Sequence, residues 1–106
     1  MHLTNDEKKY LLDLSRRIIT LKAYGKKYQK EECFSTALKS QTGIFVTLTK
    51  SHQLRGCIGY VEGIKPLQNA VEEMSIAAAF EDPRFPPVAK DEIDDIEIKI
   101  RFDKTP

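Results

Sequence analysis

A cysteine and an arginine lie two positions apart among glycines, in the segment 54–59. The pair is Arg55 and Cys57, and Gly56 and Gly59 flank the cysteine. A cysteine is a nucleophile only as the thiolate, which a nearby cation favours. Because residues i and i+2 of a strand share a face, Arg55 should point the same way as Cys57, roughly 7 Å along the strand. This spacing suggests a catalytic Cys57 supported by Arg55.

A second interpretation of the same segment is structural. Free cysteine is one of the most buried residue types and packs as a small hydrophobe, so Cys57 would belong to the core. Gly56 and Gly59 either let a ligand or another backbone come close or permit tight packing and a bulge. The residues alone leave both interpretations of Cys57 open.

Asp82 and Arg84 form a second candidate group, on either side of Pro83. They could pair with each other, or with Arg55 across a cleft that would bind an acidic ligand or a protein partner. The alternative is a hydrogen-bonded corner that closes the preceding helix. An exposed carboxylate–guanidinium pair contributes little to stability by itself.

Other chemistry has weaker support. The two cysteines and two histidines have no spacing typical of a zinc site, so we expect no metal. His52 is five residues from Cys57, roughly 16 Å along a strand, which is too far for a catalytic dyad. Gly56, Gly59 and Gly63 match neither a dinucleotide fingerprint nor a phosphate-binding loop, and we expect no cofactor.

The elements that must position these residues follow from periodicity and capping. Residues 4–25 predict a helix that begins at a Thr4/Glu7 capping box and ends at Gly25. The β-rich segments 43–49 and 54–61 predict a hairpin. A second helix is expected from Pro66, in its first turn, to about Phe80.

The C-terminal segment 96–102 alternates apolar and charged residues, which predicts a strand with one buried face. Short turns are expected near residues 35–39 and 89–93. The order helix, hairpin, helix, strand is typical of an α+β fold with a small, mainly antiparallel sheet and helices packed mostly on one face.

Composition narrows the class of protein. The chain has 106 residues, which suits one domain, and a net charge of +1. Nucleic-acid binding is therefore the weakest class, although residues 1–33 hold eight Lys/Arg against five Asp/Glu, which gives +3. No apolar stretch is long enough for a membrane span, and the charged, amphipathic segment after Asp6 leads us to expect no signal peptide. We expect a cytoplasmic protein with reduced thiols.

Several ordered motifs resemble the AMMECR domain family, also called AmmeMemoRadiSam system protein A. Residues 54–59 read LRGCIG, the motif typical of the family; residues 43–48 read GIFVTL, and residues 79–88 read AFEDPRFPPV. The segment 99–106 departs from the family pattern, and the family domain normally continues further. The resemblance therefore implies one AMMECR-like domain over residues 1–106, truncated or shortened.

The resemblance also implies a link to Memo-like proteins and radical S-adenosylmethionine enzymes, without an established activity. We expect an intracellular binding or adaptor module in which Arg55, Asp82 and Arg84 contact a protein partner. The alternative is a Cys57-dependent enzyme or cofactor-handling protein. A strand edge left uncovered in so short a chain is prone to pairing, so a homodimer through that edge is also expected.

Overall fold

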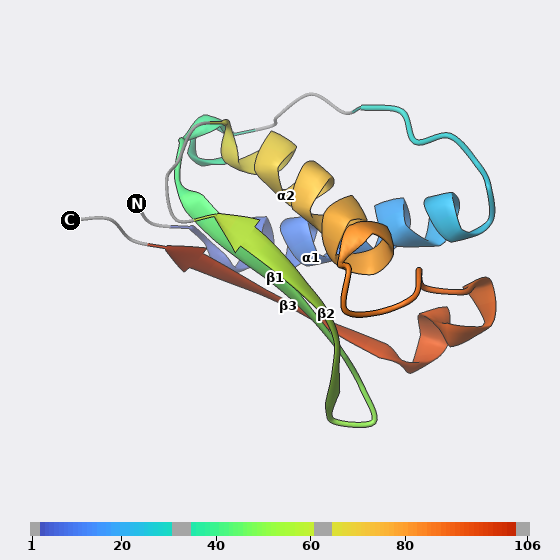
Figure 1. The fold of residues 1–106 in the computed structure, drawn as a ribbon. Helices are drawn as coiled ribbons and strands as arrows, with labels where there is room; N and C mark the ends of the chain where they lie inside the picture. Colours follow the sequence, from blue (N-terminus) through green and yellow to red (C-terminus); the bar gives the residue numbers. More distant parts are fainter. Residues whose placement is uncertain (1–2, 31–34, 61–64, 104–106) are drawn as a thin grey trace.

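The computed structural model describes residues 3–30, 35–60 and 65–103. Within these ranges, three antiparallel strands form one sheet in the order β2-β1-β3, and two helices lie on one side of it (Figure 1). The predicted α+β class with a small antiparallel sheet is confirmed. Val61, the predicted end of the second strand, lies outside the described residues, as do Cys33 and Gly63.

Helix α1 (Asn5–Ala23) begins and ends as its sequence predicts. The Thr4 hydroxyl accepts a bond from the Glu7 N–H, and the Glu7 carboxylate accepts one from the Thr4 N–H, which completes the capping box. Gly25 follows the helix at φ 73°, a left-handed conformation that glycine adopts without a steric penalty. The fully buried Leu11, Leu14 and Ile18 form the stripe that α1 packs against the core.

The hairpin consists of β1 (Gly43–Lys50) and β2 (Gln53–Tyr60), joined by Ser51 and His52. Both turn residues have positive φ, 52° and 64°, as a two-residue turn with the right-handed twist of a hairpin requires. A short 3-10 turn, η1 (Ala37–Lys39), precedes the hairpin close to its predicted place.

Helix α2 (Leu67–Ile76) continues as the π-helical turn η2 (Ala77–Glu81), and Pro66 is its N-cap rather than a member of its first turn. The chain then turns at Asp82 and passes through η3 (Lys90–Asp95) into β3 (Ile96–Asp103), which pairs with β1. None of the helices in the described ranges combines the length and apolar content that a membrane span requires.

The core lies between the sheet and the helices. Ile44, Val46 and Leu48 alternate along the central strand β1 and are fully buried on its helix side. A hydrogen bond of 2.6 Å between the buried hydroxyls of Ser15 and Ser75 joins α1 to α2. The other side of the sheet has no helix over it in the described ranges (Figure 1).

Candidate functional site

A β-bulge determines where Arg55 points. Thr47 pairs with Cys57 and Leu48 with Gly56, but Thr49 pairs with Leu54, so Arg55 is an extra residue in β2. Its side chain reaches groups on the helix side of the sheet, whereas Cys57 lies beside Thr47 on the opposite side. The prediction that Arg55 and Cys57 share a face is therefore wrong, because the i, i+2 rule holds only for a strand without a bulge.

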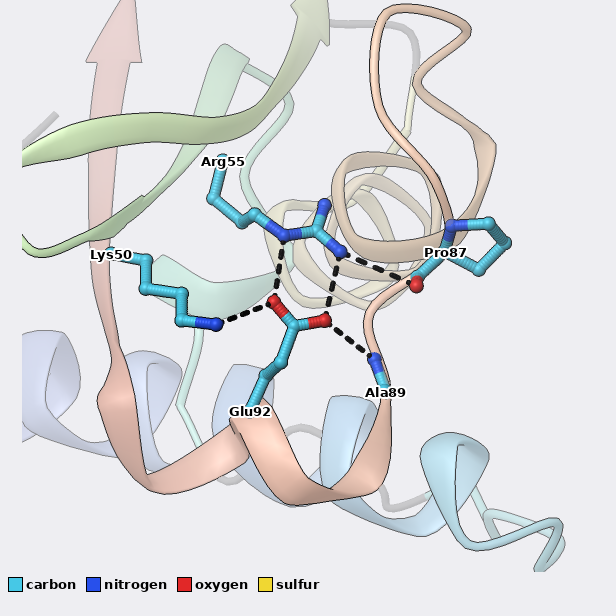
Figure 2. Close-up of polar contacts among 5 residues, drawn as sticks. All are labelled: Lys50, Arg55, Pro87, Ala89 and Glu92. Atoms are coloured by element: carbon cyan, nitrogen blue, oxygen red, sulfur yellow. Dashed lines mark hydrogen bonds and ion pairs between the residues drawn. The ribbon is translucent and has the colours of Figure 1, made fainter.

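Arg55 binds Glu92 of η3 in a two-pronged ion pair (Figure 2). Its Nε and Nη2 lie 3.0 Å from Glu92 Oε2 and Oε1, and Nη2 also donates to the Pro87 carbonyl. Lys50 and the Ala89 N–H donate to the same carboxylate. The Arg55 side chain is only 11% exposed, so this cluster joins the hairpin to η3 through largely buried contacts.

The cluster perturbs the acidity of Glu92. Bonds from Arg55 and then the Ala89 N–H, aided by Lys50, lower the pKa of Glu92 to about 2, against the opposing effect of burial. Sequence reasoning missed Glu92 and Lys50 as partners of Arg55. One available signal was the spacing of Ala89 and Glu92, in which an acid three residues after a helix cap reaches back to the cap N–H.

Asp82 and Arg84 form a corner clip on the backbone of Cys57. The Cys57 N–H donates to Asp82 Oδ2 at 3.0 Å, and Arg84 Nη2 donates to the Cys57 carbonyl at 3.2 Å. Arg84 also holds Asp82 through two bonds, of 3.0 and 2.8 Å. These bonds occupy the edge of β2 that faces away from β1. The pairing of Asp82 with Arg84 is thus observed, and neither residue pairs with Arg55 in the described ranges.

Burial and charge distinguish the two residues of the clip. The Asp82 side chain is 2% exposed, whereas that of Arg84 is 56% exposed. Hydrogen bonds from the Arg84 side chain, and then from the N–H groups of Arg84 and Cys57, hold the pKa of the Asp82 carboxyl well below its usual range. Asp82 therefore remains ionised and positions the clip, and Arg84 is the member that reaches solvent.

The two glycines allow backbone segments to approach. A Cβ on Gly56 would lie 2.1 Å from the Ala78 carbonyl oxygen of η2, and one on Gly59 would lie 2.2 Å from the Ile44 carbonyl oxygen. Gly56 thus lets the end of the second helical segment rest directly on β2. Of the two roles that the sequence left open, the structure shows close packing against backbone at both positions.

Cys57 is half-buried, and its Sγ lies 3.2 Å from the Thr47 hydroxyl. The side of the sheet away from the helices carries Cys57 together with neighbours on all three strands. We call this surface the open sheet face and define it by Phe45, Thr47, Leu54, Cys57, Lys99 and Arg101. His52 lies in the hairpin turn, and no cluster of metal-binding side chains occurs within the described residues.

Some of the basic residues in the segment 1–33 bind other groups of the molecule. Arg16 donates to the carbonyl oxygens of Ile93 and Ile96 and so fixes the entry into β3. Lys9 pairs with Asp13 one turn further along α1. The structure therefore removes Arg16 from the set of side chains that could bind a nucleic acid.

Comparison with known proteins identifies the family. The AMMECR1 family model matches residues 12–105 of the chain. This chain belongs to the AMMECR1 family. The predicted resemblance to the AMMECR domain is confirmed, and the candidate residues above lie within the matched range.

Relatives of this AMMECR1 chain occur in archaea. A protein of Methanothermobacter thermautotrophicus is 41% identical over 99 residues, which are 92% of this chain and 52% of the relative. A protein of Methanopyrus kandleri is also 41% identical, over 92% of this chain and 49% of its own length. The crystal structure of an uncharacterized protein from Pyrococcus horikoshii matches with a TM-score of 0.85 at 32% identity. The match covers 94% of this chain and 52% of that one, so the chain spans about half the length of these relatives.

Proposed function

We propose that this AMMECR1 chain is a protein-binding module whose contact surface is the open sheet face. The proposal rests on what the charged candidate residues bind. Arg55 binds Glu92, and Asp82 and Arg84 hold the backbone of Cys57. These groups position β2 instead of converging on the Cys57 thiol. What they hold in place is a surface of mixed polar, apolar and basic side chains.

The open sheet face has properties expected of an interface. Leu54 is 44% exposed, and Arg101 lies over the Phe45 ring with its guanidinium carbon 4.8 Å from the ring centre. Aromatic and arginine side chains are enriched in protein interfaces. Arg84 lies at the rim, while Asp82, Arg55, Gly56 and Gly59 act as positioning residues. By family resemblance, we propose a Memo-like protein or a radical S-adenosylmethionine enzyme as the partner.

Leu54→Arg is expected to weaken binding of such a partner at least tenfold, about 1.4 kcal/mol, because it places an unpaired charge inside the contact surface. Purified Memo-like and radical S-adenosylmethionine proteins from the same genome would be titrated with the chain by calorimetry. Tyr24→Arg is the matched control, since Tyr24 is 54% exposed but lies at the end of α1. The proposal would be contradicted if the chain bound neither protein, or if both variants weakened the binding equally.

A second candidate function, a Cys57-dependent enzyme or cofactor-handling protein, is favoured by the setting of the thiol. Cys57 is half-buried on the open sheet face, and its thiol contacts the Thr47 hydroxyl. The Arg84 guanidinium donates a hydrogen bond to the Cys57 carbonyl. A small electrophile or an anionic group of a cofactor could reach this position.

In a Cys33→Ser background, we expect iodoacetamide to alkylate Cys57 in the folded chain, because the thiol lies on a face that no helix covers in the described ranges. Mass spectrometry would follow the modification without and with denaturant. Modification only after unfolding would mean that Cys57 is a packing residue. Full cellular function of Cys57→Ser would also remove the enzymatic candidate.

A further inference from the structure

The two outer edges of the sheet differ in protection. On β2, the corner clip of Asp82 and Arg84 occupies the outward N–H and C=O of Cys57. On β3, no strand covers the outer edge within the described residues, where the sheet order is β2-β1-β3, although Arg16 binds the outward Ile96 carbonyl at the start of the strand. An unpaired edge is a template for a further strand, and proteins usually cover or disrupt such edges.

The free backbone groups of β3 follow from the pairing pattern. Because the Cys57 backbone groups point away from β1, its partner Thr47 directs its own groups toward β3. Thr47 pairs with Lys99, so Lys99 points its backbone groups inward and the adjacent Ile98 and Ile100 point theirs outward. Both isoleucines therefore offer a donor and an acceptor to an added strand.

A groove runs along the same edge. It has a volume of about 440 Å³ and lies between α1, which contributes Lys8 and Leu12, and β3, which contributes Ile98, Ile100 and Phe102 among others. Leu12 is 38% exposed there. An added strand would extend the sheet and cover this apolar strip at the same time, as in strand-addition interfaces.

The charges on β3 are complementary to a second copy of the same strand. Glu97, Lys99 and Arg101 lie on the face away from the helices, where Glu97 and Lys99 form a loose, exposed ion pair of 3.9 Å within one copy. In an antiparallel pair with Ile98 opposite its own copy, Glu97 lies opposite the partner's Lys99, and the reverse contact forms by symmetry. The same register places Ile96 opposite the partner's Ile100 on the helix side, where the Ile96 carbonyl would accept a bond from the partner in addition to the one from Arg16.

We propose that two copies of this chain pair through β3, antiparallel and centred on Ile98, to form one continuous six-stranded sheet. We assign the added strand to a second copy because, in this register, Glu97 and Lys99 each lie opposite a residue of opposite charge on the other copy. The pairing uses the edge, the groove and Lys99 of the open sheet face, whereas Leu54 and Cys57 on β2 remain available on each copy. It does not rest on the proposed partner.

Sedimentation equilibrium of the full chain should show a concentration-dependent species of twice the 12.1 kDa chain mass. Lys99→Glu should raise the dissociation constant about tenfold, because it sets like charges opposite each other twice. The exchanged double variant Glu97→Lys/Lys99→Glu should return the dissociation constant toward wild type. An equimolar mixture of Glu97→Lys and Lys99→Glu should form heterodimers more strongly than either variant self-associates.

Hydrogen exchange provides the second measurement. The amides of Ile98 and Ile100 should become more protected as concentration rises, and Leu54→Arg should leave this protection unchanged. A chain that stays monomeric at all concentrations would overturn the proposal. A dimer whose dissociation constant is unchanged by Lys99→Glu would also overturn it. The same holds if the Ile98 and Ile100 amides are protected from exchange only when a separate polypeptide is added, such as the part of the Methanothermobacter relative that this chain does not match.

Discussion

Gly56→Ala is expected to lower the free energy of unfolding by about 3 kcal/mol or more, the upper range for overpacking a core. The added methyl carbon would lie 2.1 Å from the Ala78 carbonyl oxygen. That oxygen belongs to the backbone of η2 and cannot rotate away as a side chain does. The sheet and the helical layer must therefore separate at this point, which urea unfolding of both proteins would measure.

Gly25→Ala is the control for this prediction. Gly25 has no neighbouring atom within 4 Å of an added Cβ, but its φ of 73° strains any other residue. A left-handed conformation costs roughly 1–2 kcal/mol for an L-residue with a Cβ. Gly56→Ala should therefore be the more destabilising of the two variants. Equal effects would mean that contact with Ala78 is not what requires glycine in β2.

Glu92→Gln is expected to lower the free energy of unfolding by about 3 kcal/mol at neutral pH. This magnitude corresponds to the shift of the Glu92 pKa from 4.5 to about 2 in the folded state. The folded pKa is depressed, so the carboxylate stabilises the fold fully above pH 4.5. That contribution is lost as pH falls toward 2, where protonation weakens the bonds to Arg55 and Lys50. The stability difference between wild type and Glu92→Gln should therefore shrink over this interval.

Asp91→Asn provides the matched control for Glu92→Gln. It removes the same charge from the exposed neighbouring position in η3. Denaturant unfolding at neutral pH should show a smaller effect for Asp91→Asn than for Glu92→Gln, because Asp91 is exposed. A pH-independent difference between wild type and Glu92→Gln would count against the ion-pair cluster as the source of the stability.

Both large effects concern the way in which β2 is fixed to the rest of the molecule. Gly56 lets η2 rest on the strand, the adjacent Arg55 ties it to η3, and the clip at Cys57 closes its outer edge. The motif in residues 54–59 is therefore a point where three segments meet. To solvent it presents Leu54 and the Cys57 thiol, its two members of the open sheet face.

The sequence by itself determined the elements and the family. The capping box at Thr4, the stop at Gly25 and the alternation in β3 depend on hydrogen bonds and periodicity among neighbouring residues. Such local signals are present before any tertiary contact forms. The ordered motifs likewise indicated the AMMECR1 family, which the match over residues 12–105 shows.

Only the tertiary structure decided how the candidate residues are used. The bulge that turns Arg55 away from Cys57 depends on the register between two strands, and a shift of one residue reverses the direction of a side chain. Glu92 lies 37 residues from Arg55, and Asp82 lies 25 residues from Cys57, so neither contact has a local signature. These partners were selected by the packing of η2 and η3 against β2, since a buried charge or backbone group must find a partner wherever the fold brings one within reach.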